Sequence, residues 1–250
     1  MIKLKTVGEL RLMRAAGRIS QRALRLAGEA VEPGVSTKEI DEIVHKYIEE
    51  QGATPSFLGY GGFPASACIS VNNVVVHGIP SEKQILRSGD IVSIDVGACF
   101  NGYHGDNAWT FPCGEVSKEA KRLMKTTEES LFEGINAAKA FARIGDIGYA
   151  VQRYAELRSY SVVRDFLGHG VGANLHEDPK VPNYGTPDTG AKLLPGMVIA
   201  VEPMINMGDY RVRVLKDGWT TVTADGSLSA HFEHTIAITN DGPVILTSLD

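Results

Sequence analysis

The sequence predicts an α+β fold in a single domain made of two similar halves. Two observations are local: amphipathic segments begin at capping boxes, and Asn101-Gly102 joins two strand-like runs. The third is a strand-like segment that occurs in both halves of the chain. No linker interrupts the sequence, so we expect one domain over residues 1–250, with halves at roughly 6–112 and 113–245.

Composition narrows the class of protein. With 250 residues, 43% hydrophobic and 22% charged, the chain can bury the core of an ordinary globular protein. A net charge of −5 gives no basic surface for nucleic acid. The three cysteines lack CxxC spacing, and the sequence has neither a signal-peptide pattern nor an apolar run of about 18 residues. We therefore expect a protein of the reducing cytoplasm, without membrane contact.

The first part of the chain predicts two helices. In each, a Thr or Ser cap is followed three residues later by Glu, which is the spacing of a capping box. The first helix begins at Thr6, and its apolar residues continue at helical spacing to about Gly28. The second begins at Ser36 and ends at Gly52.

A loop and two strands follow these helices. Residues 56–64 are rich in glycine and aromatic residues, which predicts a loop that lines a cavity. Residues 68–71 and 74–77 have strand composition on either side of an Asn72-Asn73 turn.

The strongest local signal is the hairpin around Asn101-Gly102. A type I′ turn needs positive φ at both central residues, and Asn-Gly supplies it. With these two in the turn, Phe100 pairs with Tyr103 and the two strands extend outward on either side.

The register of this hairpin places two acids on one face. Counting outward, Gly97 faces Asp106, and Asp95 shares the face of Asp106 at a diagonal distance of roughly 7–8 Å. Two carboxylates this close would repel each other unless a cation lies between them. A shared metal ion and a pair of solvated acids are both open at this point.

The second half repeats the order of the first. A long helix is expected from Ser117 to about Lys139, and a shorter one around residues 147–157. A strand and a glycine-rich turn occupy residues 162–172, and closing strands are expected at 212–214 and 231–238.

One segment of the second half matches one of the first. Residues 193–202 resemble residues 86–95, and aligning Gly89 with Gly196 places Asp95 against Glu202. An acid therefore ends the same strand in both halves. This predicts two α/β halves related by a pseudo-twofold axis, with their acids converging between them.

Five polar residues stand out because they interrupt apolar strands or lie beside them. They are Asp95, Asp106, His169, Glu202 and Glu233. Carboxylate oxygens with one imidazole and no thiolate suit Mn, Fe, Co or Zn in a two-metal arrangement. Two divalent ions would also balance the charge of four carboxylates.

Seven motifs resemble those of type I methionine aminopeptidases of bacterial length, which are pita-bread metallopeptidases. The motifs are Val-His-Gly-Ile-Pro (76–80), Ile-Asp-Val-Gly (94–97), Asn-Gly-Tyr-His-Gly-Asp (101–106), Gly-His-Gly-Val-Gly (168–172), Leu-His-Glu-Asp-Pro (175–179), Val-Glu-Pro (201–203) and Phe-Glu-His-Thr (232–235). The resemblance runs essentially end to end. It implies the pita-bread fold, with a curved and mostly antiparallel central sheet, and the co-translational removal of initiator methionine from nascent proteins.

The resemblance also implies a dinuclear metal site. Asp95 would chelate one ion, Asp106 and Glu233 would bridge both, and His169 with Glu202 would complete the other. The cofactors would be two divalent ions per chain, drawn from Co, Mn, Fe, Zn or Ni, which acidify a bridging water.

Three residues would act directly on the substrate. By the resemblance, Glu202 would carry a proton to the leaving amine, His176 would stabilise the oxyanion, and His77 would hydrogen-bond the scissile amide nitrogen. For each histidine, a purely local hydrogen bond in a turn is the alternative.

The family's methionine pocket is matched with two exchanges in its lining and a third difference at its mouth. The corresponding positions here are Phe57, Tyr60, Phe63, Cys68, Leu175 and Trp219. Phe57 stands where the family has a small thiol, Leu175 where it has an aromatic, and Gly61 where it often has a histidine. A paired large and small exchange can conserve volume. We expect intact metal chemistry with altered side-chain selectivity; the alternative is that Phe57 points elsewhere and nothing changes.

Two other functions compete with this one. Prolidases and Xaa-Pro aminopeptidases share the fold and the metals, but they usually carry an additional N-terminal domain, for which the chain before Thr6 leaves no room. Metal-free pita-bread modules bind ribosomes or RNA, but they would have broken ligands and a basic surface. The resemblance instead implies a monomer that meets Met-initiated nascent chains and makes a transient ribosome contact.

Overall fold

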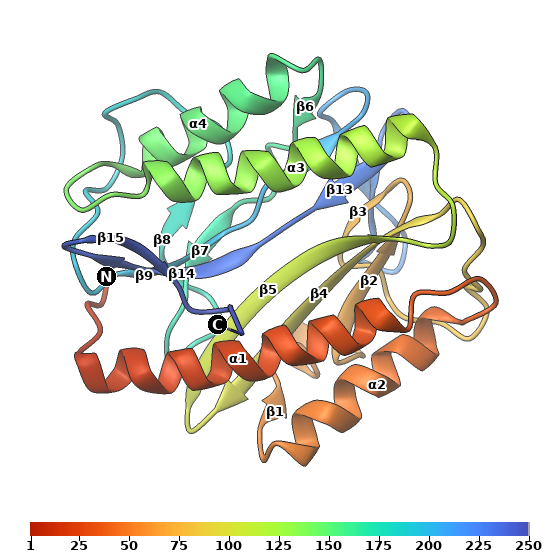
Figure 1. Cartoon of the computed structure of the whole chain (residues 1–250), viewed down its shortest axis with the longest axis horizontal. Coiled ribbons are helices and arrows are strands. Elements are labelled where there is room, and N and C mark those ends of the chain that lie inside the picture. Colours follow the sequence, from red (N-terminus) through yellow and green to blue (C-terminus); the bar gives the residue numbers. More distant parts are fainter. Residues whose placement is uncertain (250) are drawn as a thin grey trace.

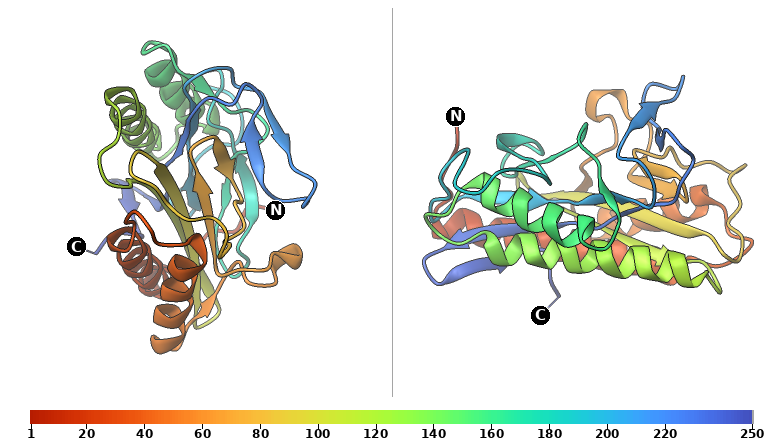
Figure 2. Two further views of the ribbon diagram at one scale, coloured as in Figure 1. Left: turned by 90° about the vertical axis from the view of Figure 1, so that its right-hand side faces the viewer. Right: turned by 90° about the horizontal axis from the view of Figure 1, so that it is seen from above.

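The structure is a computed structural model, and it describes residues 1–249. Within these residues, the four α-helices lie on one side of the molecule and the strands on the other (Figure 2). The α-helices are α1 (Val7–Glu29), α2 (Thr37–Glu50), α3 (Lys118–Ala137) and α4 (Ile144–Glu156), with a short 3-10 helix, η1 (Tyr60–Gly62). In Figure 1, α1 and α2 cover one half of the strands, and α3 and α4 cover the other.

The strands divide between the same two halves. Those of the first half are β1 (Thr54–Pro55), β2 (Ala67–Val71), β3 (Val74–Val76), β4 (Ile91–Phe100) and β5 (Tyr103–Pro112). Those of the second half are β6 (Ser161–Val162), β7 (Gly168–Gly170), β8 (Glu177–Val181), β9 (Val198–Val201), β10 (Met204–Asn206), β11 (Val212–Val214), β12 (Thr221–Thr223), β13 (Ser229–His231), β14 (His234–Thr239) and β15 (Gly242–Ile245).

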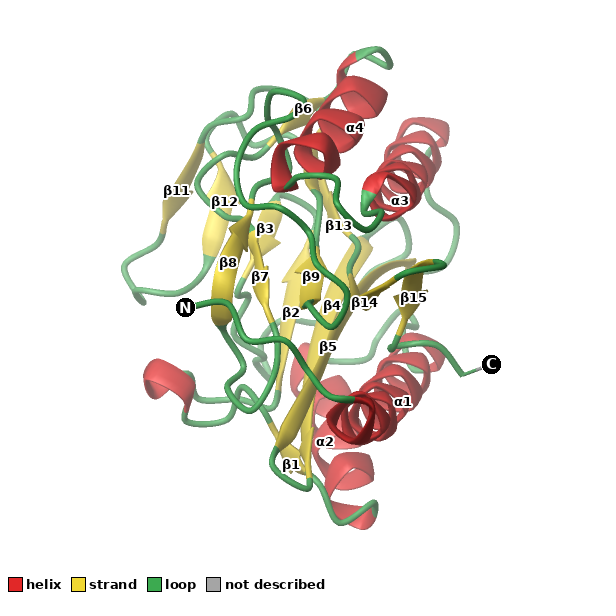
Figure 3. Cartoon of the chain, turned by 90° about the vertical axis from the view of Figure 1, so that its left-hand side faces the viewer, coloured by secondary structure: helices red, strands yellow, loops and turns green. Residues whose placement is uncertain are grey.

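Two larger sheets dominate (Figure 3). In the first, β5 pairs with one edge of β4, and β1 and β2 pair with the other. The second has the order β15-β14-β9-β7-β8, and two three-stranded sheets, β13-β10-β6 and β11-β12-β3, complete the molecule. Every pairing among these strands is antiparallel, which confirms the predicted α+β class.

Both predicted capping boxes form. The Thr6 hydroxyl accepts a hydrogen bond from the Glu9 N–H, and the Glu9 carboxylate accepts one from the Thr6 N–H. Ser36 and Glu39 repeat the arrangement at α2. These bonds satisfy amide groups that a helix N-terminus otherwise leaves unpaired. The helices therefore begin where the sequence predicts.

The central hairpin has the predicted turn and register. Asn101 and Gly102 have φ of 49° and 80°, as a type I′ turn requires. Phe100 pairs with Tyr103, and Gly97 pairs with Asp106. This register was the basis for placing the two acids on one face, and it is confirmed.

The matching segments of the two halves make equivalent backbone hydrogen bonds, each to its own partner. Gly89, with φ of 104°, donates to the carbonyl of Cys113, and Gly196, with φ of 93°, donates to that of Ile238. In both halves the strand begins two residues after the glycine. The two halves thus reach the centre of the molecule by the same local geometry.

One sequence prediction is wrong in detail. Residues 231–238 were expected to form one strand, but β13 ends at His231 and β14 begins at His234. At this break the Glu233 N–H donates to the carbonyl of Ala108 on β5, and the Phe232 N–H donates to that of Pro203. The strand is interrupted because its backbone joins the sheets of the two halves instead of continuing one ladder.

The core lies between helices and sheets. One apolar cluster joins α1 and α2 to the first sheet, and a second joins α3 and α4 to the strands of the second half. Within residues 1–249, none of the helices has the length and apolar character that a membrane span requires.

Candidate active site

One cavity collects every residue that the sequence analysis assigned to a site. These residues are Phe57, Tyr60, Phe63, Cys68, His77, Asp95, Asp106, His169, Leu175, His176, Glu202, Trp219 and Glu233. They come from both halves of the chain, so the site exists only where the two sheets meet.

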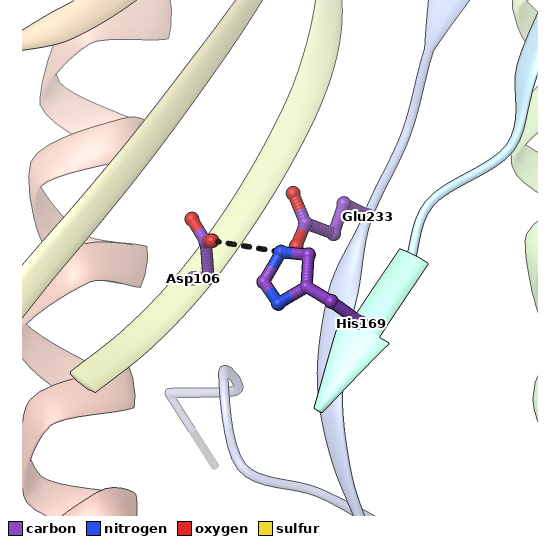
Figure 4. A group of neighbouring side chains, drawn as sticks. All are labelled: Asp106, His169 and Glu233. Atoms are coloured by element: carbon purple, nitrogen blue, oxygen red, sulfur yellow. Dashed lines mark ion pairs between the residues drawn. The ribbon is translucent and has the colours of Figure 1, made fainter. Parts of the chain in front are cut away.

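Three of these residues form the tightest polar group, which we call the acid–histidine cluster: Asp106, His169 and Glu233. Each offers one ligand atom within 4.8 Å of the other two, and all three are buried. Figure 4 shows the side chains converging from β5, from β7 and from the break between β13 and β14. His169 Nε2 lies 3.6 Å from Asp106 Oδ2.

Asp95 and Glu202 lie outside this tightest group but line the same cavity. Asp95 projects from β4 beside Cys68 of β2, its partner in the ladder. Glu202 directly follows β9, and its Oε1 lies 3.5 Å from His169 Nε2. The Glu202 carbonyl accepts a hydrogen bond from Asn183 Nδ2, which fixes the backbone there.

Backbone hydrogen bonds orient the cluster. His169 Nδ1 donates to the carbonyl of Gly170 at 2.9 Å, because a carbonyl can only accept. The lone pair of Nε2 is then directed toward the acids, as in metal-ligating histidines. The Asp106 N–H donates to Thr235 Oγ1, and that hydroxyl donates back to the Asp106 carbonyl. Asp106 is therefore tied to β14.

Burial and mutual repulsion raise the pKa of the acids. Burial raises the pKa of Asp106 to about 7. Burial first, and then repulsion from Asp106, raise the pKa values of Asp95, Glu202 and Glu233 well above those of free carboxyl groups. Burial lowers the pKa of His169 to about 3, so its imidazole is neutral. Four acids crowded in this way need a counter-charge.

The donor set fits divalent metal ions. Asp95 Oδ1, Asp106 Oδ1 and Glu233 Oε1 are fully buried and have no hydrogen-bond partner within the described residues. Unpaired buried carboxylate oxygens are costly, and a metal ion is the partner that would satisfy several at once. Oxygen donors with one neutral imidazole match Mn, Fe, Co or Zn.

Two further histidines face the cavity. His176 Nδ1 is 2.7 Å from the Tyr60 hydroxyl, and its ring centroid lies 4.1 Å from that of His169. His77 has φ of 59°, a conformation that costs energy in a non-glycine residue and is common at functional sites. Burial and then the nearby His176 lower the pKa of His77 to about 4, so it is a neutral hydrogen-bonding group.

The remaining lining is apolar. Phe57, Phe63, Cys68 and Leu175 pack together in one buried cluster, and Trp219 contacts Phe63 edge-on at 5.2 Å. Phe57 faces the cavity and does not point elsewhere.

Two glycines allow close packing of aromatic rings at this lining, one beside Phe57 and one beside Trp219. A Cβ on Gly97 would lie 2.8 Å from the Phe57 ring, so only glycine there lets the ring rest on β4. Gly61 has φ of 55°, and a Cβ there would lie 3.3 Å from Trp219. The absence of a side chain at 61 therefore allows Trp219 to close over the loop.

Sequence reasoning missed four lining residues: Val76, Phe166, Leu167 and His231. The first three are apolar and carried no distinguishing signal. His231 did carry one, because it lies two residues before Glu233 and alternation would place both on one face. The sequence otherwise predicts His231 only as part of a closing strand.

Residues 11–240 match the sequence profile of metallopeptidase family M24. The chain is 56% identical over 247 residues to a methionine aminopeptidase of Clostridium perfringens, covering 99% of each chain. Its structure matches that of a methionine aminopeptidase of Thermotoga maritima with a TM-score of 0.98 and 45% identity, covering 99% of this chain and all of the other.

A prolidase of Pyrococcus horikoshii is more distant. The TM-score is 0.80 at 25% identity, and the match covers 99% of this chain but only 64% of the prolidase. Together these similarities confirm the pita-bread fold.

Proposed function

We propose that this chain, which belongs to metallopeptidase family M24, is a metal-dependent methionyl aminopeptidase. It would remove the initiator methionine from nascent polypeptides. One observation carries this: a buried acid–histidine cluster opens directly onto an apolar pocket within one cavity. Such a cavity can hold an apolar first side chain while the first peptide bond lies beside the cluster.

The metal complement follows from the donors. We propose that Asp95, Asp106, His169, Glu202 and Glu233 hold two divalent ions, of the kinds Co, Mn, Fe, Zn or Ni. When bound, the ions supply Lewis acidity, which polarises a carbonyl oxygen and makes water a nucleophile at neutral pH.

Residues of this chain would bind the substrate side chain and transfer the proton. Phe57, Phe63 and Cys68 would bind the methionine side chain and exclude water from it. Water adds to the carbonyl carbon, and the bond to the amide nitrogen then breaks. Glu202 would take the proton from the attacking water and deliver it to the departing amine.

The two histidines would act on the reacting amide. His176, with Nδ1 engaged by Tyr60, would direct its other nitrogen at the developing oxyanion. His77, neutral and fixed by its backbone conformation, would hydrogen-bond the scissile amide nitrogen. Both contributions depend on orientation, which Tyr60 and the ring contact between His77 and Phe166 at 5.3 Å supply.

The proposed partners, cell compartment and oligomeric state are those that suit this substrate. Nascent chains that begin with Met are the proposed partners, with a transient ribosome contact, in the cytoplasm. We propose that the chain works as a monomer and as one domain with halves at about 6–112 and 113–245, since the cavity draws residues from both.

Calorimetry with Mn²⁺ and cleavage of Met-Ala-Ser test the proposal. We expect two equivalents of Mn²⁺ to bind and methionine to be released, and Asp106→Ala to lose both properties. A wild type that binds no metal and releases no methionine would contradict the proposal and favour a binding module. Faster cleavage of an Xaa-Pro peptide than of Met-Ala-Ser would favour the prolidase-like function instead.

A further inference from the structure

His231 is a buried imidazole of the cavity to which the proposed mechanism gives no role. It ends β13, is 2% exposed, and its Nε2 has no hydrogen-bond partner within the described residues. Other histidine rings behave differently: His234 Nδ1 bonds Thr247, and His45 Nδ1 bonds Ser66. Leaving a buried polar atom unpaired is energetically costly, so this nitrogen is expected to have a partner.

The backbone at His231 leaves its side chain little choice of direction. The His231 N–H donates to Thr110 Oγ1 at 3.0 Å, and the Thr110 hydroxyl donates to the His231 carbonyl at 2.8 Å. Met204 of β10 pairs with His231 on the other side. The backbone of His231 is therefore held from two strands, at a position from which the imidazole lines the cavity.

The group that His231 faces is Glu202. Its Nε2 lies 3.9 Å from Glu202 Oε2, while the other oxygen, Oε1, lies 3.5 Å from His169 Nε2. The carboxylate therefore sits between two imidazoles, with one oxygen toward each. At 3.9 Å the His231 contact is longer than a hydrogen bond, but Oε2 is the oxygen of Glu202 that lies toward this unpaired nitrogen.

We propose that His231 is a positioning residue that engages Glu202 Oε2 and thereby keeps Oε1 turned toward His169 and the acid–histidine cluster. This inference rests on the proposed function, because it concerns how Glu202 is presented to metal and substrate. Partners behind a metal ligand fix its orientation, and their loss typically weakens metal binding about 10–100-fold.

Two substitutions at 231 separate chemistry from packing. His231→Leu keeps comparable bulk without a donor, and His231→Gln restores an N–H that can reach a carboxylate. His234→Gln is the matched control, since it removes a buried imidazole three residues away that lines a different surface, near Trp109 and Phe132.

Mn²⁺ calorimetry on metal-free protein and steady-state kinetics on Met-Ala-Ser provide the readouts. We expect His231→Leu to weaken Mn²⁺ binding about tenfold or more without changing its stoichiometry, and to lower kcat with little change in KM. His231→Gln should recover most of both losses, and His234→Gln should bind Mn²⁺ like the wild type.

Three results would overturn the inference. Metal affinity and kcat of His231→Leu equal to those of the wild type would show that Glu202 needs no such partner. Loss of one whole equivalent of Mn²⁺ would make His231 a direct ligand and not a positioning residue. A wild type that binds no Mn²⁺ would defeat the proposed function and this inference together, whereas the first two results leave the proposed function standing.

Discussion

Phe57 is the residue that most distinguishes the pocket. It is buried against Phe63, Cys68 and Leu175, and its ring rests on Gly97, two residues from Asp95 on the same strand. A large ring this near the polar centre reduces the depth available to a substrate side chain. Leu175 in the same cluster is smaller than the aromatic residue that the family has there, so it leaves part of the pocket volume free for the substrate side chain.

We predict that Phe57→Cys changes side-chain selectivity. Removing the ring leaves unfilled space, so the preference for Met-initiated over norleucine- and Leu-initiated peptides should fall by roughly tenfold, the scale of one methylene in an apolar pocket. Rates of kcat/KM on the three peptides measure it. Leu58→Ala is a control from the same loop, since Leu58 is 48% exposed.

The double variant Phe57→Cys/Leu175→Phe tests compensation. If the two positions share volume, the second change should restore most of the preference for methionine. Selectivity of Phe57→Cys identical to that of the wild type would contradict this account of the pocket.

At the scale of elements, the N-terminal segment fastens the loop that carries His176. Lys5 Nζ lies 2.7 Å from Glu177 Oε2, and both side chains are almost fully buried. The other oxygen of Glu177 accepts the Asn174 N–H. The loop from 174 to 177 is thus held by a residue some 170 positions earlier in the chain.

We predict that Lys5→Met destabilises the fold by about 3–5 kcal/mol, because it leaves a buried carboxylate without its partner. Urea unfolding measures the change. Lys3→Met, in the exposed part of the same segment, should stay within about 0.5 kcal/mol of the wild type.

A double variant that removes both buried charges tests whether the ion pair accounts for this loss of stability. Lys5→Met/Glu177→Gln should regain much of the lost stability, since no unpaired charge remains buried. A double variant less stable than Lys5→Met alone would mean that packing, and not the ion pair, holds this loop.

The first helix is tied to the hairpin through Glu9. Its carboxylate accepts hydrogen bonds from the Thr6 N–H and hydroxyl and from the Tyr103 hydroxyl. These bonds, with the Thr6 N–H contributing most, lower the pKa of Glu9 from 4.5 to about 2. The stabilisation is therefore complete above about pH 4.5 and is lost as the pH falls toward 2.

We predict a matching pH dependence for Glu9→Gln. The wild type should unfold at a higher urea concentration than the variant at pH 6, and the gap should shrink steadily between pH 5 and pH 3. Urea midpoints over this range measure it. A gap independent of pH would show that the ionised form of Glu9 contributes nothing.

In the whole molecule, the cavity brings acids of the two halves close together, and their negative charges repel one another. Asp95 and Asp106 come from the first half, and Glu202 and Glu233 come from the second. Without cations, folding forces these buried acids together and raises their pKa values. Metal binding should therefore stabilise the junction of the halves.

We predict that Mn²⁺ raises the thermal unfolding midpoint of the metal-free protein. At a free ion concentration 100 times Kd, a single site contributes about 2.7 kcal/mol. Asp106→Asn should abolish this gain, and the variant without metal should be more stable than the wild type without metal at pH 8, because one repelling charge is gone. Calorimetric scans with and without Mn²⁺ measure both. A thermal unfolding midpoint of the wild type that does not change when Mn²⁺ is added would contradict the prediction.

Features that depend only on neighbouring residues follow from the local sequence. Capping at Thr6 and Ser36 and the turn at Asn101-Gly102 each arise within about four residues, so their signals are complete in the local chain. The hairpin register, and with it the shared face of Asp95 and Asp106, follows from the turn alone.

The way in which the two halves meet depends on long-range packing and is visible only in the folded molecule. The break in the strand at Glu233 depends on a hydrogen bond to Ala108, more than a hundred residues away, and no local pattern encodes it. The contact of His231 with Glu202 and the burial of Lys5 with Glu177 arise in the same way. Side-chain partners across a sheet junction are set by the packing of distant segments, which is why the local sequence does not reveal these contacts.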